Sequence, residues 1–296
     1  MKAHPVDTIS VEVAAAEAAQ LGEAPVWDHA ASRLVWVDIA GRLVHFYDPL
    51  SRADTCVAVP ETPGVAIPRQ AGGLVLAAGH GFGFVDQDQR FEEVAQIPQR
   101  QVLARMNDGN CDSAGRFWAG TAGLNEEPQA GALYRLDPDL TVTRVLDHVG
   151  ESNGIDWSPD DRIMYYVDSL ERRVDAFDFD LSTGVISNRR PFVVIDEGEA
   201  VPDGLTVDAD GGVWVAVWGG SQLRRFAPDG SLDRVIRLPT RQITSCAFGG
   251  PDLEDLYVTS AREGLSPEVL LQEPDAGSVF VCKPGVRGRP QRTFAG

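Results

Sequence analysis

Short runs of apolar and aromatic residues alternate along the chain with turns rich in Asp, Gly, Ser and Pro. Alternation within the runs, and their β-branched and aromatic residues, favour strands over helices. The turn-and-strand pattern recurs six times, in residues 28–39, 70–79, 112–121, 158–169, 208–219 and 250–261. The first apolar residues after these turns are Leu34, Leu74, Phe117, Ile163, Val213 and Leu256, which lie 40, 43, 46, 50 and 43 residues apart.

Each run is followed by a further strand that ends in another turn, as in residues 43–49 and 132–139. A repeat of 40–50 residues with several short strands is typical of a β-propeller blade. We therefore predict an all-β fold, with residues 1–296 forming a single six-bladed β-propeller domain. A strand over residues 8–14 is expected to join the last blade and close the ring, with residues 1–7 flexible. A pair of β-sandwiches also has regular turns, but the period disfavours it.

The charge of the chain excludes several classes of partner. It has 26 Lys+Arg against 44 Asp+Glu, a formal net charge of −18. Nucleic acids and anionic membrane surfaces both need a basic face, so neither is expected as a partner. The chain has no membrane-spanning apolar stretch and no apolar run of a signal peptide near its start. Its four cysteines show no CxxC spacing, so we expect reduced thiols and a cytoplasmic location.

Polar residues recur about ten positions before the repeat anchors. Glu23, Asn107, Asn153 and Asp203 share this register, and Asp108 follows Asn107. If the innermost strand of each blade begins here, these side chains surround one end of the central axis. The corresponding positions in the second and sixth repeats hold Gly64 and Ser245.

Carboxylates brought together in a narrow pore repel one another unless a cation offsets their charge. Glu23, Asp203 and a neutral Asn carbonyl would balance a divalent ion, and an all-oxygen set suits Ca²⁺, Mg²⁺ or Mn²⁺. Three protein ligands leave positions open, as a catalytic site requires. Asn-Asp-Gly and Pro-Asp-Gly are also ordinary turn sequences, so each motif taken alone favours a turn. Their shared register favours a site.

With these motifs the chain resembles the SMP-30/gluconolactonase/regucalcin family of six-bladed lactone hydrolases. The resemblance extends from about residue 20 to 284. It rests on LGEAPVWD (21–28), RMNDGNCDSAGRFWAGT (105–121), GALYRLDPD (131–139), ESNGIDWSPDDRIMYYVDS (151–169), VDAFDFDLSTGVISNRR (174–190), VPDGLTVDADGGVWVA (201–216), TSCAFGG (244–250) and YVTSAREGLSPE (257–268).

The resemblance implies the role of each site residue. The metal ligands would be Glu23, Asn153 and Asp203, and the cofactor one divalent cation, with calcium the first candidate and manganese, magnesium or zinc as alternatives. Arg105 and Asn107 would contact the sugar lactone, with Asp108 beside them, and Asp203 would also be the general acid/base.

The chain departs from the family's pattern at two places. Ala24 stands where the family often has Gly. The loop between Thr121 and Gly131 looks shorter than in the animal members, which place a substrate-binding Glu there. Either Glu126 or Glu127 is a candidate for that role, and the choice between them stays open.

The implied function is metal-dependent hydrolysis of a sugar lactone to its aldonic acid, with the metal polarising the carbonyl. A salt bridge to the pore carboxylates is the alternative role for Arg105. Alternative functions are a calcium-binding regulatory propeller without turnover and an organophosphate or aryl-ester hydrolase of the same fold. A serine hydrolase is disfavoured because the chain has no GxSxG elbow. The particular lactone and the oligomeric state stay open.

Three tryptophans are candidates for a sugar-stacking platform. Trp118 and Trp214 hold matching repeat positions inside strands, which favours core packing between blades. Trp218 lies beside two glycines, and we expect it at the rim of the pocket.

Overall fold

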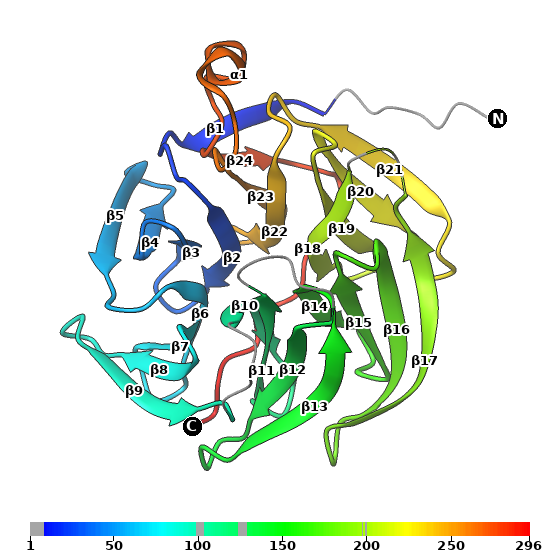
Figure 1. Cartoon of the computed structure of the whole chain (residues 1–296). Helices are drawn as coiled ribbons and strands as arrows, with labels where there is room; N and C mark the ends of the chain where they lie inside the picture. The colour runs from blue at the N-terminus through cyan, green and yellow to red at the C-terminus, as the bar shows by residue number, and fades with distance from the viewer. Residues whose placement is uncertain (1–8, 99–103, 124–128, 197, 199) are drawn as a thin grey trace.

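A computed structural model describes residues 9–98, 104–123, 129–196, 198 and 200–296. Within these residues the chain forms six four-stranded antiparallel sheets, arranged as blades around a central axis (Figure 1). The predicted six-bladed β-propeller is confirmed. The repeat anchors from Leu34 to Leu256 lie at or beside the start of the second strand of each blade. Residues 1–7 and the candidates Glu126 and Glu127 lie outside the described residues.

The first three blades run in chain order from the axis outward. Blade 1 comprises β2 (Gly22–Asp28), β3 (Arg33–Asp38), β4 (Leu43–Asp48) and β5 (Ala53–Ala58). Blade 2 comprises β6 (Pro63–Pro68), β7 (Leu74–Ala78), β8 (Gly81–Val85) and β9 (Phe91–Gln96). Blade 3 comprises β10 (Ala104–Cys111), β11 (Phe117–Gly123), β12 (Gly131–Leu136) and β13 (Val142–Val149).

The last three blades include the one that closes the ring. Blade 4 comprises β14 (Ser152–Trp157), β15 (Ile163–Asp168), β16 (Arg173–Asp180) and β17 (Val185–Val194). Blade 5 comprises β18 (Val201–Val207), β19 (Val213–Trp218), β20 (Gln222–Phe226) and β21 (Leu232–Arg237). Blade 6 comprises β22 (Ile243–Gly249), β23 (Asp255–Ser260), β24 (Val279–Cys282) and β1 (Val11–Ala15).

The N-terminal strand closes the ring. β1 is the outermost strand of blade 6 and pairs antiparallel with β24, with Val11 opposite Cys282. This pairing covers an edge that would otherwise be open to another chain. The closure agrees with the prediction, although the strand covers residues 11–15 and begins later than the predicted residue 8.

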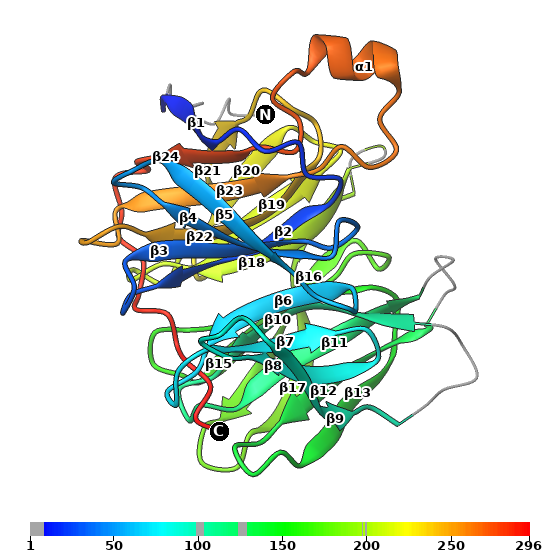
Figure 2. The same ribbon diagram turned by 90° about the vertical axis from the view of Figure 1, so that its left-hand side faces the viewer.

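One helix, α1 (Pro267–Gln272), interrupts blade 6 between β23 and β24 and projects from the ring (Figure 2). This helix is not among the predicted elements, although Ser266 caps its N-terminus and Pro267 stands at its first turn, a recognised start signal. In the part of the chain that the structure describes, no helix is long and apolar enough to cross a membrane.

Tryptophans packed between blades form much of the core, and turn aspartates satisfy their polar ends. Trp118 and Trp214 are fully buried. The Nε1 of Trp118 donates to Asp112 at 2.8 Å, and that of Trp214 donates to Asp208 at 2.9 Å. A buried indole needs such a partner. These two aspartates therefore stabilise the core at equivalent turns of the repeat.

The inner strands carry an irregularity that shapes the axis. Register shifts occur at Glu23/Val26 in β2, Met106/Gly109 in β10, Ser152/Ile155 in β14 and Pro202/Leu205 in β18. A β-bulge re-aims side chains and bends its strand. The polar residues in register sit at these bulges, inside strands, so interpreting Asn-Asp-Gly and Pro-Asp-Gly as ordinary turns is wrong.

Glycines at the bulge of β14 and at a further bulge, Pro63/Val65 in β6, let neighbouring blades approach closely at the axis. A Cβ on Gly64 would lie 2.3 Å from the carbonyl oxygen of Asn107, and one on Gly154 would lie 2.4 Å from the backbone nitrogen of Leu205. Real side chains do not tolerate such contacts, so a larger residue would push the inner strands apart. The narrow axis that gathers the polar residues depends on these two positions.

Candidate metal and substrate site

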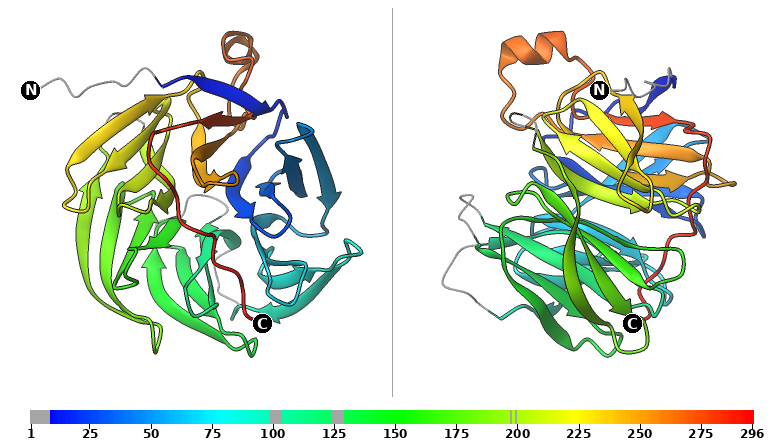
Figure 3. Two further views of the ribbon diagram at one scale, coloured as in Figure 1. Left: turned by 180° about the vertical axis from the view of Figure 1, so that it is seen from behind. Right: turned by 90° about the vertical axis from the view of Figure 1, so that its right-hand side faces the viewer.

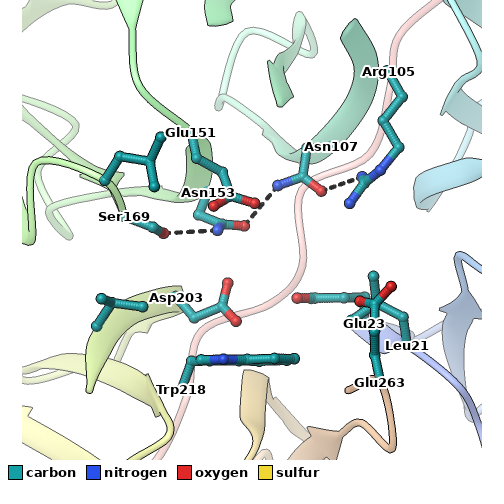
Figure 4. Close-up of a pocket in the computed structure, with 12 residues that line it drawn as sticks. Leu21, Glu23, Arg105, Asn107, Glu151, Asn153, Ser169, Asp203, Trp218 and Glu263 are labelled. Carbon is teal, nitrogen blue, oxygen red and sulfur yellow. Dashed lines mark hydrogen bonds between the residues drawn. The ribbon is translucent and has the colours of Figure 1, made fainter. Parts of the chain in front are cut away.

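A cavity of about 350 Å³ opens at one end of the propeller axis (Figure 4). Most of its side chains come from the inner strands and from the loops on the face that carries α1. The lining residues are Leu21, Glu23, Arg105, Asn107, Glu151, Asn153, Ser169, Leu170, Val201, Asp203, Trp218 and Glu263. The cavity therefore contains five of the six residues predicted for the site.

The three predicted metal ligands come from three different blades and face one another across this cavity (Figure 4). Glu23 lies in β2, Asn153 in β14 and Asp203 in β18, each at the bulge of its strand. Their exposed fractions are 5%, 5% and 6%. Residues that share one position in the sequence repeat thus lie together in the folded chain.

A chain of hydrogen bonds fixes the amides of the site. Ser169 Oγ donates to the carbonyl oxygen of Pro202 at 2.7 Å and accepts from Asn153 Nδ2 at 2.8 Å. Asn153 Oδ1 accepts from Asn107 Nδ2 at 2.9 Å, and Asn107 Oδ1 accepts from Arg105 Nη1 at 2.6 Å. Each donor in this series of hydrogen bonds meets an acceptor. The series therefore fixes the orientation of both amides, with Asn153 Oδ1 toward Asn107 and Asn107 Oδ1 toward Arg105.

Burial and neighbouring carboxylates raise the pKa of both Glu23 and Asp203. Burial, followed by the charge of Asp108, raises the pKa of Glu23 to about 8. Burial, followed by the charge of Glu23 and then that of Glu151, raises the pKa of Asp203 well above its usual range. Ionising all of these carboxylates at once is unfavourable, because they repel one another in a water-poor cavity.

A divalent cation fits this donor set. Asp203 Oδ1 is buried and has no hydrogen-bond partner among the described residues. Glu23 accepts one hydrogen bond, from the backbone of Ala24 at 2.8 Å. Two carboxylates and a carboxamide are hard oxygen donors of the kind that calcium, magnesium and manganese take. The described residues contain no cluster of three or more His, Cys, Asp or Glu suited to a metal, so this mixed set depends on the Asn.

Arg105 and Asn107 lie beside these donors in the same cavity (Figure 4). Arg105 is half-buried and donates to Asn107 and to the carbonyl oxygen of Met106. Its positive charge lowers the pKa of both Glu23 and Asp203 in part, although burial outweighs it. Within the described residues Arg105 makes no ion pair with these carboxylates, and it lines the cavity with them.

Asp108 lies apart from the other predicted residues. It lines a smaller cavity of about 20 Å³ deeper in the axis, together with Ser245 and Gln291, and is absent from the lining of the upper cavity. Its Oδ1 accepts from the backbone of Gly109 at 2.7 Å, and burial raises its pKa to about 7. The structure therefore places Asp108 beneath the site, where its charge acts on Glu23.

Several lining residues are absent from the predicted site. Glu151 and Glu263 add carboxylates to the cavity, and Ser169 orients Asn153. Glu151 stands two positions before Asn153, and this closeness in sequence is the only signal that points to it. Ser169 lies in the turn directly after β15, 16 residues beyond Asn153, and no local pattern marks its role. Trp218 lines the cavity, as expected, and no histidine is among the described lining residues.

Comparisons with known proteins assign the family. The family model described as the SMP-30/Gluconolactonase/LRE-like region matches residues 21–262 of this chain. The chain is 42% identical over 296 residues to regucalcin from Danio rerio, covering 98% of this chain and all of that protein. It is 38% identical over 299 residues to regucalcin from Homo sapiens, again covering 98% of this chain and all of the relative.

Solved structures agree with this fold. A luciferin-regenerating enzyme superposes with a TM-score of 0.90 at 32% identity, covering 97% of this chain and 99% of the other. A calcium-binding protein, regucalcin from Agrobacterium tumefaciens, superposes with a TM-score of 0.92 at 28% identity, covering 97% of each chain. A gluconolactonase from Xanthomonas campestris gives 0.76 at 21% identity, covering 95% of this chain and 91% of the other, and shares the fold.

Fold and site together define a six-bladed β-propeller with an acidic cavity at one end of its axis. The chain belongs to the SMP-30/gluconolactonase/regucalcin-like family.

Proposed function

We propose that the protein hydrolyses a sugar lactone to its aldonic acid, with one divalent cation held by Glu23, Asn153 and Asp203. The observation that carries the proposal is the convergence of these three oxygen donors in an open cavity, where Asp203 Oδ1 is buried and has no hydrogen-bond partner among the described residues. A site built only to hold an ion structurally would enclose it, whereas this cavity has room for a ligand of several carbon atoms. The names of the relatives support both metal binding and lactone hydrolysis.

A bound divalent cation supplies a Lewis acid for the carbonyl oxygen of the lactone. Calcium is the first ion to test, because a structural relative is described as calcium-binding. Manganese, magnesium and zinc remain candidates, because oxygen ligands accept several ions and availability decides.

Asp203 is the proposed general acid/base. Its carboxylate accepts a proton from the attacking water and returns it to the ring oxygen as the ester bond opens. The reaction consumes one water and yields a carboxylic acid, which ionises at neutral pH. Burial and the nearby carboxylates raise the pKa of Asp203, whereas a bound cation would lower it and keep the carboxylate ionised, ready to accept a proton. Its position relative to the substrate supplies a further part of the rate.

Arg105 and Asn107 are the proposed substrate-binding residues. The Arg105 guanidinium offers a rigid fork of donors to hydroxyl or carbonyl oxygens, and its bond to Asn107 holds that fork in place. Asp108 was predicted to act beside them. Its position below the site instead supports an electrostatic effect on Glu23.

Lactone hydrolysis tests this proposal directly. Pentono- and hexono-lactones are followed by pH-stat with the protein stripped of metal and then reloaded with Ca²⁺, Mn²⁺, Mg²⁺ or Zn²⁺. We expect turnover that is lost on stripping and restored by at least one ion. The variant Asp203→Asn, which keeps the side-chain volume, should reduce kcat by at least about a hundredfold. Undiminished turnover after complete metal removal would contradict the metal-dependent reaction.

The calcium-binding relative from Agrobacterium tumefaciens supports calcium binding, and a calcium-binding propeller without turnover is therefore the second candidate. That function predicts Ca²⁺ affinity and no hydrolysis of any lactone in the panel. A phosphotriester and an aryl ester in the same panel test the remaining alternative, because an oxygen-ligated cation polarises a phosphoryl oxygen as well. A higher kcat/KM on either of these than on every lactone would reassign the substrate. A cytoplasmic location remains a proposal, consistent with four free cysteines.

A further inference from the structure

The chain beyond β24 crosses the face of the propeller opposite α1 (Figure 3). We call residues 286–296 the C-terminal strap. Its backbone and side chains bond to turns or inner strands of blades 6, 5, 4, 3 and 2 in succession. The partners include Leu253, Val207, Trp157, Ser113 and Pro68. The strap thus bonds to five of the six blades along a single segment.

Two strap arginines converge on one buried carboxylate. Arg289 Nη2 and Arg292 Nη1 lie 3.0 and 2.9 Å from Asp156 Oδ1. Arg292 also pairs with Asp161 at 2.7 Å. Asp156 is 4% exposed, and a buried carboxylate without a partner is costly. The two arginines therefore stabilise blade 4 by pairing with this buried carboxylate.

The strap contacts the strands that carry the proposed site. Asp156 lies three residues after Asn153 in β14, and its Oδ2 accepts from the backbone of Val207, four residues after Asp203 in β18. Arg289 Nε donates to the carbonyl oxygen of the same Val207 at 3.2 Å. The spacing between β14 and β18 is thus set by a cluster of charges at the end of these strands away from the cavity.

A third inner strand is held in the same way. Gln291 Nε2 donates to Asn110 Oδ1 at 2.8 Å, and Asn110 lies three residues after Asn107 in β10. Asn110 Nδ2 in turn donates to the carbonyl oxygen of Ile155 in β14 at 3.1 Å. The strap and its partners therefore connect β10, β14 and β18 at the same level of the axis.

The strap also forms the floor of the axis. Two cavities of about 20 Å³ each, roughly the size of one water molecule, lie between Asp108 and the strap. Gln291 lines both of them, and Cys246 lines the upper one. Cys246 is 3% exposed. Removing the floor would open a path from solvent to this thiol.

We propose that Arg289 and Arg292 are positioning residues for the metal site, and that the strap closes the second opening of the axis. The arginines act through Asp156 and Val207 on the spacing of Asn153 and Asp203, which lie on the same two strands. The first part of this proposal rests on the proposed metal site, whereas closure of the axis does not. Partners that orient ligands from outside the coordination sphere commonly change metal affinity by one to two orders of magnitude.

The test compares the double variant Arg289→Met/Arg292→Met with Arg287→Met. Arg287 lies in the same strap but pairs with Glu254 at the surface, at 2.8 Å. Ca²⁺ affinity is measured by isothermal titration calorimetry at a temperature where circular dichroism shows each variant folded. Alkylation of Cys246 by N-ethylmaleimide is followed by peptide mass spectrometry, which separates it from exposed Cys56. Lower global stability alone leaves the Ca²⁺ affinity of folded molecules unchanged.

We expect the double variant to bind Ca²⁺ about tenfold more weakly and to alkylate at Cys246 at least tenfold faster, with Arg287→Met like the wild type. Unchanged Ca²⁺ affinity in the folded double variant would overturn the positioning role, and unchanged alkylation would overturn the closure. If the double variant does not fold, the single variant Arg292→Gln, which leaves Arg289 paired with Asp156, is tested by the same two measurements. The same outcomes in Ca²⁺ affinity and in Cys246 alkylation then decide the two parts of the proposal. If the wild type binds no divalent ion, the proposed metal site fails, and the alkylation rates still decide the closure.

Discussion

Ser169 determines which end of the Asn153 amide faces the site. Its hydroxyl donates to the carbonyl oxygen of Pro202 at 2.7 Å and so must accept the bond from Asn153 Nδ2 at 2.8 Å. The nitrogen of the amide is thereby committed to Ser169, and the oxygen is left for Asn107 and the cavity. A neutral amide serves a cation only through its oxygen, so the orientation is a condition for metal binding.

We predict that Ser169→Ala weakens metal binding while the fold persists. Without the serine acceptor, the Asn153 amide loses the partner that distinguishes its two ends, and a rotated amide would place a donor toward the cation. The loss of a buried hydrogen bond of this kind corresponds to about 1–2 kcal/mol, or roughly a tenfold lower Ca²⁺ affinity. Isothermal titration calorimetry measures it.

Ser158→Ala is the matched control for that variant. Ser158 is also buried and caps the turn at the other end of the β14–β15 pair, where its Oγ accepts from the backbone of Ile163. We expect it to reduce thermal stability without changing the metal affinity. Equal effects of the two variants on affinity would show that Ser169 acts only through general stability.

The stability of the metal-free protein should fall as pH rises from 6 to 8. Burial raises the pKa of Glu23 to about 8 and that of Asp108 to about 7 in the folded chain. The unfolded chain loses these protons near pH 4, so it binds fewer protons than the folded chain across this window. Stability linked to these groups is therefore present at low pH and lost toward pH 8. We expect Tm in a chelator to drop by about 5 °C.

Two comparisons check the origin of that slope. Glu23→Gln removes one of the titrating groups and should flatten the decrease measured by calorimetry. Saturating Ca²⁺ should flatten or reverse it in the wild type, because metal binding favours the ionised carboxylates. The carboxylates whose pKa is lowered, such as those of Asp160 and Asp178, are ionised in both states above pH 6 and do not contribute. A slope unaffected by either change would assign the effect to other groups.

The backbone at Ala24 explains why glycine is common at this position in the family. Ala24 has φ of +44°, in the left-handed region that favours glycine, and it follows Glu23 at the bulge of β2. Ala24→Gly should relieve strain of about 1 kcal/mol or more, offset in part by the greater freedom of glycine in the unfolded chain. We expect a small net rise in Tm, about 1–2 °C, by calorimetry.

Ala119→Gly provides the opposite case. Ala119 is fully buried in the regular strand β11, where glycine brings only a loss of packing and a gain of unfolded-state entropy. Its Tm should fall. A fall in Tm for Ala24→Gly as well would contradict the strain at residue 24.

The fold was predictable because its unit repeats along the sequence. The period of the anchors from Leu34 to Leu256 survives variation in loop length, and each turn-and-strand segment corresponds to one blade. The short helix α1 was not predicted, because residues 267–272 are too few for helical periodicity to emerge. Its Ser-Pro start was readable only as a local signal.

The site was predictable where its residues repeat with the blades, and not elsewhere. Glu23, Asn107, Asn153 and Asp203 occupy one register, which the bulges turn toward the axis. Ser169 lies outside that register and reaches Asn153 only through the pairing of β14 with β15. Asp108 is adjacent to Asn107 in sequence but lies at a different depth, because neighbouring residues of a bulged strand point in different directions.

Charge in the cavity should select against anionic lactones. Glu23, Glu151, Asp203 and Glu263 line it together with Arg105, so the formal charge is −4 + 1 = −3, or −1 with a divalent cation. Glu263 is exposed at the rim, and its variant Glu263→Gln keeps the side-chain size. We expect this variant to raise kcat/KM for a lactone carrying a second carboxylate about threefold relative to a neutral aldonolactone, at low salt. The gain should shrink in 0.5 M NaCl, where the screening length falls to about 4 Å. A ratio that neither the variant nor the salt changes would show that shape, and not charge, selects the lactone.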